Sequence, residues 1–295
     1  MCRILFLLCL LLLCRALSVD ACDPPPAYYW LDSTAAQYFI TYSEEYSQRL
    51  VTIQDLYRTG KTFRDSSAEH KQSDALRYDL QQVCDTSRLT LAVLSHNLSF
   101  KMKDPGLREY SEDLFKQLNK DSTCQLYKAY LGSLRMMKVR DEGVKGAVVS
   151  GFKSFFGGKT AFGKARDGYH VISEAVSRDS ASVPIRILRV SAAVESADKL
   201  GELLDSARID LEWLTAYYDR LVPEERFLTL LTWAKFYYRL EGRLPSDSAL
   251  AGMNLWMDRA YYYSRSDSCL NYYYGTEVEL WKKKDSLLAA ECARE

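Results

Sequence analysis

The sequence predicts an all-α fold of antiparallel helical hairpins packed side by side. Apolar residues recur at intervals of three and four along most of the chain, and this spacing places them on one face of a helix. Pro184, Pro223 and Pro245 each stand where a new helix is expected to begin. The sequence has no alternating apolar run bounded by hairpin turns, so we expect no strands. An irregular helical bundle is the alternative arrangement of the same helices.

Residues 1–21 predict a signal peptide. Arg3 precedes an unbroken apolar run from Ile4 to Cys14, which is too short to span a bilayer because a span needs roughly 20 apolar residues. Val19 and Ala21 occupy the positions where a signal peptidase accepts small side chains before a cut after Ala21. We therefore expect an exported protein that resides in the periplasm or at the surface of an envelope membrane.

Residues 22–31, after the predicted cut, form a proline-rich spacer. Cys22 becomes the first mature residue, where a lipid anchor would tether the chain to a bacterial membrane. Asp20, the second residue before this cysteine, fits a lipidation motif poorly. We favour simple secretion and keep lipidation of Cys22 as the alternative.

Charge limits the class of partner. The chain has 39 basic and 39 acidic side chains, and cleavage after Ala21 removes Arg3, Arg15 and Asp20, which leaves a net charge near −1. Such a balance creates no broad positive field to attract phosphates, so we expect no nucleic-acid partner. The hydrophobic fraction of 47% is enough for a chain of this length to bury a core.

The mature chain retains an odd number of cysteines, which in an exported protein leaves one thiol unpaired or modified. Lipidation of Cys22 would leave an even number to pair. Proximity in the sequence favours disulfides between Cys84 and Cys124 and between Cys269 and Cys292. Ordinary buried thiols are the alternative.

The N-terminal helical region comprises residues 32–142. Asp104 and Pro105 provide a cap and a favourable first-turn proline, and Asp121 with Ser122 opens another helix. Apolar stripes predict helices that carry residues 38–57, 76–98, 105–118 and 126–137.

Residues 143–168 form a glycine-rich connection that also carries phenylalanines and basic residues. Gly157-Gly158-Lys159-Thr160 is not a phosphate-binding loop, because Lys153 stands where that loop requires glycine. We interpret the segment as a loose connection whose phenylalanines cover the core, since glycines weaken a free helix. The alternative is a basic, aromatic patch that associates with an anionic membrane surface.

The C-terminal helical region comprises residues 169–295. Its clearest amphipathic stripe runs from Leu200 to Leu221 and keeps the spacing of three and four throughout. We expect helices near residues 167–178, 184–198, 200–221, 223–241, 247–264 and 268–292.

Tyrosines are abundant and clustered in this region. Adjacent residues on a helix point about 100° apart, so each cluster can place one ring in the core and another on an exposed flank. Such rings on a concave helical surface suit a peptide, a sugar or a small organic ligand, and packing between helices is the alternative role. The candidate ligand-binding residues are Tyr217, Tyr218, Tyr237, Tyr238, Tyr261 and Tyr262.

Residues 168–189 resemble the second helix of a tetratricopeptide repeat followed by the first helix of the next repeat. Gly168, Ile172 and Ala175 match the small, large and small positions of that helix, whereas Ser180 replaces the usual proline. The resemblance covers about one and a half repeats. The whole chain is similar to degenerate periplasmic repeat proteins, including the lipoproteins that accompany tripartite solute transporters. This resemblance implies a tetratricopeptide-like solenoid and an accessory binding or docking role without catalysis.

The sequence carries no recognisable catalytic or metal-ligating pattern. His70, His96 and His170 have no second histidine or carboxylate at a metal-ligand spacing, and no serine lies in a nucleophile elbow. We therefore expect no catalytic residue, metal or cofactor. The sequence predicts a non-catalytic protein that binds a protein or small ligand of the bacterial envelope. The alternatives are an envelope enzyme that acts on cell-wall glycans and a purely structural spacer.

Overall fold

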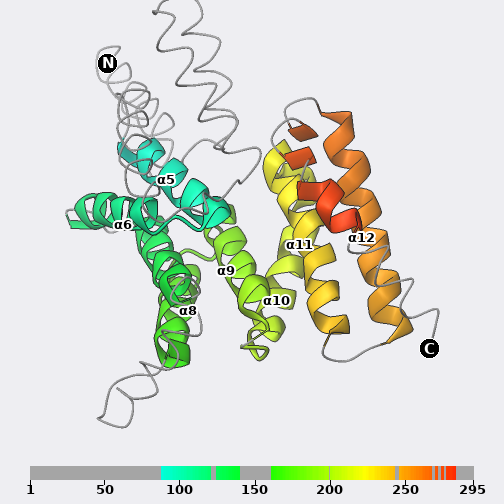
Figure 1. Ribbon diagram of the computed structural model, residues 1–295, viewed down its shortest axis with the longest axis horizontal. Coiled ribbons are helices and arrows are strands. Elements are labelled where there is room, and N and C mark those ends of the chain that lie inside the picture. Colours follow the sequence, from blue (N-terminus) through cyan, green and yellow to red (C-terminus); the bar gives the residue numbers. More distant parts are fainter. Residues whose placement is uncertain are drawn as a thin grey trace, which may run out of the picture.

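The computed structural model of the chain (Figure 1) describes residues 88–120, 124–139, 161–198, 200–242, 246–267, 270–271, 274–275 and 277–283. The predicted signal peptide, the proline-rich spacer, the first predicted helix and residues 143–160 of the glycine-rich connection lie outside the described residues. The same is true of His70, Cys22, Cys84, Cys269 and Cys292.

All regular structure within these ranges is helical, which confirms the all-α prediction. None of the described helices is both long and apolar enough to cross a membrane. In chain order the helices are α5 (Arg88–Met102), α6 (Pro105–Lys120), a helix at 125–139, α8 (Ala161–Arg178), α9 (Val183–Ser196), α10 (Leu203–Ala216), the short 3-10 helix η1 (Tyr218–Arg220), α11 (Pro223–Glu241) and α12 (Asp247–Ser266). Residues 277–283 are also helical.

Several helices begin where the sequence provides a start signal. Asp104 caps α6, because its Oδ1 accepts a hydrogen bond from the Leu107 amide at 2.9 Å. Pro223 opens α11, and the Glu225 side chain accepts a hydrogen bond from the Val222 amide at 3.0 Å. These local interactions satisfy amides that a helix N-terminus leaves without an intrahelical partner.

Helices that are neighbours in the sequence pack against each other. Such pairs include α5 with α6, α8 with α9, α9 with α10 and α11 with α12, and α9 also contacts α11. Figure 1 shows α11 and α12 side by side at one end of the molecule, with α9 and α10 between them and α8. This order of contacts suits hairpins packed in sequence. Whether they stack as a regular solenoid stays a prediction.

One apolar core runs through these helices. Leu94, Leu98, Leu107, Phe115 and Phe227 are its largest fully buried side chains. They come from α5, α6 and α11, so the described parts on both sides of the glycine-rich connection contribute to the same core.

Helix α8 begins earlier than the sequence indicated. It starts at Ala161, so the last eight residues of the predicted 143–168 connection are helical. Gly168 is tolerated inside this helix because its backbone packs directly against Gly132 of the helix at 125–139. The close helix crossing thus explains why a poor helix former occurs here.

Helix α10 is shorter than the predicted 200–221. It ends at Ala216, and η1 follows before α11 begins. The Arg226 side chain donates hydrogen bonds to the carbonyl oxygens of Tyr218 and Asp219, at 3.1 and 2.7 Å. If the helix continued, these two carbonyl oxygens would accept hydrogen bonds from amides of the next turn. The Arg226 side chain replaces those amides.

Candidate functional site: a pocket and an aromatic surface

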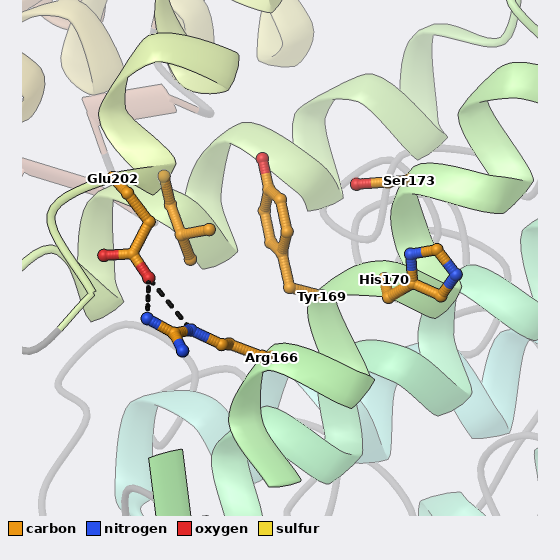
Figure 2. Close-up of a pocket in the computed structure, with 6 residues that line it drawn as sticks. Arg166, Tyr169, His170, Ser173 and Glu202 are labelled. Carbon is orange, nitrogen blue, oxygen red and sulfur yellow. Dashed lines mark hydrogen bonds and ion pairs between the residues drawn. The ribbon is translucent and has the colours of Figure 1, made fainter. Parts of the chain in front are cut away.

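A pocket lies between α8 and the start of α10 (Figure 2). Four polar or aromatic residues of α8 line it at the spacing of one helix face, and the turn before α10 provides the opposite wall. Its volume is about 380 Å³, at the small end of the range for ligand pockets. The lining residues are Arg166, Tyr169, His170, Ser173, Glu202 and Leu203.

An ion pair joins the two walls. The Nε and Nη2 atoms of Arg166 donate to the same oxygen, Oε1 of Glu202, at 3.0 and 2.6 Å. The two side chains are 64% and 52% exposed, so the pair contributes little to stability. Figure 2 shows this pair on one side of the Tyr169 ring and Ser173 on the other.

Tyr169 connects the pocket to the protein interior. Its side chain is buried, and burial raises the pKa of its hydroxyl. Ser206 and Ser173 lie near that hydroxyl, but it makes no hydrogen bond of normal geometry with any described residue. Arg189 and Asp210 are close enough to influence the hydroxyl electrostatically.

A buried charge cluster lies beyond Tyr169. The Asp210 side chain is fully buried and accepts a hydrogen bond from Arg186 Nη1 at 2.6 Å. Arg189 donates to both Asp210 oxygens, at 2.6 and 2.7 Å. Burial alone would lower the pKa of Arg189, but its hydrogen bonds and charge attraction to Asp210 raise it. The cluster ties α9 to α10 through a fully buried carboxylate and two arginines that are largely shielded from water.

This cluster also supports an exposed aromatic ring. The Arg186 guanidinium stacks over Trp213 at 4.3 Å from the ring centroid, and Trp213 stacks on Tyr217 with centroids 4.3 Å apart. Tyr217 is 39% exposed, and Arg220 lies 5.5 Å from its centroid. The stack therefore holds an exposed tyrosine in one orientation without using its hydroxyl.

A second aromatic stack joins α10, α11 and α12. Trp233 stacks on Trp256 with centroids 5.3 Å apart, and its Nε1 donates to Thr215 Oγ1 at 2.8 Å. Tyr237 also stacks on Trp233, with centroids 5.7 Å apart, and a Cβ added to Gly252 would lie 2.7 Å from the Tyr237 ring. Gly252 therefore allows Tyr237 to lie directly on the backbone of α12.

The other tyrosines that were predicted to bind a ligand occupy separate environments. Tyr218 packs beside Arg226, whereas Tyr238 meets the edge of Trp281. Tyr261 lies under Arg265, and Tyr262 is 70% exposed. The described contacts do not gather all six into one pocket, and a ligand-binding role for them stays a prediction.

The described histidines differ in environment. His96 is buried, with Nδ1 2.9 Å from Asn97 Oδ1 and Nε2 2.9 Å from Ser133 Oγ. Because the amide oxygen only accepts, Nδ1 carries the hydrogen and Nε2 accepts from the serine. His96 therefore serves packing, whereas His170 lies in the pocket. In the part of the chain that the structure describes, no group of three His, Cys, Asp or Glu residues could hold a metal ion.

Two half-buried carboxylates converge on Lys235. Its Nζ lies 3.3 Å from Glu195 Oε1 and 2.9 Å from Glu277 Oε1. Burial alone would lower the pKa of Lys235, but the two carboxylates outweigh burial and raise it. The lysine stays charged and neutralises the acids, so this site joins α9, α11 and residues 277–283 and does not resemble a glycosidase acid pair.

Cys124 is the described cysteine, and it forms a disulfide whose partner lies outside the described residues. Its side chain is buried in the core just before the helix at 125–139. The predicted pairing with Cys84 stays a prediction.

The pocket was not predicted from the sequence. The spacing of Arg166, Tyr169, His170 and Ser173 on one helix face was a readable signal, but Glu202 is far away along the chain. Comparisons of the chain with models of known families, with curated proteins and with solved structures find no match. The fold defines the protein as an all-α protein of packed helices.

Proposed function

We propose that this chain is an exported, non-catalytic binding protein of the bacterial envelope that docks a partner protein through its aromatic surface. This surface comprises Trp213, Tyr217, Arg220, Trp256 and Arg259. The signal peptide predicted at residues 1–21 supports export, and the disulfide at Cys124 suits an oxidising compartment. A tetratricopeptide-like arrangement of the helices remains part of this proposal.

The observation that carries docking is the held, exposed ring of Tyr217. Tyrosine, tryptophan and arginine dominate the energetics of protein interfaces, and a rigid ring loses little conformational entropy on binding. Tyr217 is fixed by Trp213, and Trp213 is fixed by the buried cluster of Arg186 and Asp210. The packing that orients Tyr217 leaves part of its ring open to a partner.

Arginines add polar character to this surface. Arg259 lies over Trp256 at 4.8 Å, and Arg220 lies beside Tyr217. Neither guanidinium forms an ion pair with a described residue. Acidic groups of a partner could therefore pair with them without breaking an existing bridge.

Site-specific photocrosslinking in cells that make the full chain tests this proposal. A photoreactive phenylalanine derivative at position 217 should give one discrete protein adduct, which excess unmodified protein suppresses. The matched control is the same group at Lys116, an exposed position on α6. Equal adducts from both positions, or none from 217, would contradict docking at this surface.

The envelope enzyme and the structural spacer are the competing functions. The enzyme would need two carboxylates that face each other across an open cleft, whereas Glu195 and Glu277 have Lys235 between them. A spacer would not need a partly exposed ring held as firmly as that of Tyr217.

A further inference from the structure

The pocket between α8 and α10 offers a ligand chemistry distinct from that of the aromatic surface. Its wall residues Glu202 and Leu203 stand at the start of α10, whereas Tyr217 follows the end of that helix. A helix of 14 residues is about 20 Å long, so the two sites are well separated.

More apolar than polar surface lines the pocket, and a few side chains provide its polar groups. Tyr169 and Leu203 are buried, so the polar atoms that a ligand could meet belong to Arg166, Glu202, Ser173 and His170. A sugar that stacks on an open aromatic face finds little ring surface here. Groups that carry charge or hydrogen-bond donors and acceptors find several partners.

A ligand could replace either member of the ion pair at the pocket. Arg166 directs both donors at a single oxygen of Glu202, whereas a ligand carboxylate could give each donor its own oxygen. Both side chains are largely exposed, so opening the pair costs little. A ligand with only a negative charge would take Arg166 from Glu202, and a ligand with only a positive charge would take Glu202 from Arg166.

We propose that the pocket binds a free α-amino acid, whose carboxylate replaces Glu202 on Arg166 and whose ammonium group pairs with Glu202. The ammonium and carboxylate groups of an α-amino acid are attached to the same carbon, so they suit two protein groups that already touch. The termini of an extended peptide are separated by about 3.3 to 3.6 Å for each residue and suit this juxtaposition less well. The amino-acid side chain extends past Tyr169 towards Ser173 and His170, which favours a polar one (Figure 2).

Calorimetric titration of the full mature chain tests this proposal with four forms of one compound. L-glutamine carries both charges, and its N-acetyl derivative keeps only the negative one. The α-amide keeps only the positive charge, and the form with both modifications is neutral. We expect L-glutamine to bind roughly tenfold or more tightly than each other form, because each modification removes one charge-assisted interaction. Failure of all four to bind, or equal binding of the neutral form, would overturn the proposal.

Matched variants test whether the ligand binds in this pocket. Arg166→Gln and Glu202→Gln should each weaken L-glutamine binding at least tenfold and leave the thermal midpoint nearly unchanged, since both residues are exposed. Arg178→Gln is the control, because Arg178 forms an exposed ion pair with Glu174 on the same helix but does not line the pocket. An equal loss in Arg178→Gln would also overturn the assignment. The crosslinking experiment at position 217 is independent of these results.

Discussion

Gly132 and Gly168 face each other where the helix at 125–139 crosses α8. A Cβ atom on Gly132 would lie 2.6 Å from the Gly168 carbonyl oxygen, and a Cβ atom on Gly168 would lie 2.8 Å from the Gly132 carbonyl oxygen. Neither backbone oxygen can move aside as a flexible side chain could. The absence of both side chains therefore sets how closely these helices approach.

Gly132→Ala should destabilise the protein by roughly 1 to 3 kcal/mol, because the added methyl group forces the two helices apart. Chemical denaturation followed by circular dichroism measures this loss. Gly242→Ala is the control, since Gly242 has a helical φ of −61° and its added Cβ would lie 3.7 Å from the nearest atom. That substitution should be neutral or stabilising, and equal losses from both would contradict the role of the crossing.

Asp210→Asn should destabilise the protein by about 3 to 5 kcal/mol, because the buried Arg186 and the partly buried Arg189 would then lack their counter-charge. The change keeps the size of the side chain and so tests the charge itself. Glu212→Gln on the same helix breaks only an exposed pair with Arg208 and should change stability by less than about 0.5 kcal/mol. Urea unfolding curves that show the same midpoint for both variants would argue against a critical buried cluster.

Tyr130 should make the fold sensitive to alkaline pH. Burial first, and the negative charge of Glu224 second, raise the pKa of Tyr130 above its ordinary value of 10.0. Above that pH the unfolded chain loses the tyrosine proton while the folded chain keeps it, so the unfolding free energy falls by up to about 1.4 kcal/mol per pH unit. Below that pH this contribution to stability is fully present.

Tyr130→Phe should therefore flatten the loss of stability above pH 10, as measured by urea unfolding at a series of pH values. Tyr262→Phe is the comparison, because the Tyr262 ring is 70% exposed. The prediction fails if both variants keep the slope of the unmodified protein.

Reduction of the Cys124 disulfide should lower the stability of the protein by about 2 to 5 kcal/mol. Cys124→Ser should lower the thermal midpoint under oxidising conditions and make it insensitive to a reducing agent. Peptide mapping without reduction identifies the partner, and we expect Cys84. A peptide that links Cys124 to Cys269 or Cys292 would contradict the predicted pairing.

Much of the fold could be predicted from local sequence. Asp104 and Pro223 mark the starts of α6 and α11, because caps and first-turn prolines act within a few residues. Repeating apolar residues predicted the helix interiors for the same reason. The end of α10 was missed, since it depends on the bonds that Arg226 makes with Tyr218 and Asp219.

The candidate site was less accessible to sequence reasoning. The six tyrosines were recognised as a group, but their neighbours differ because adjacent helical residues face different helices. Asp210 stands beside the apolar stripe of α10, which could have marked it as a buried charge. Its two arginine partners lie on another helix, and no local pattern reveals that pairing.

By itself the sequence determined that this chain forms amphipathic helices and where several of them begin, since these properties depend on residues within a few positions of one another. Only the tertiary structure decided which helices touch, that Arg166 meets Glu202, and that Gly132 meets Gly168. Those relationships join residues about 36 positions apart, and packing rather than local preference brings them together.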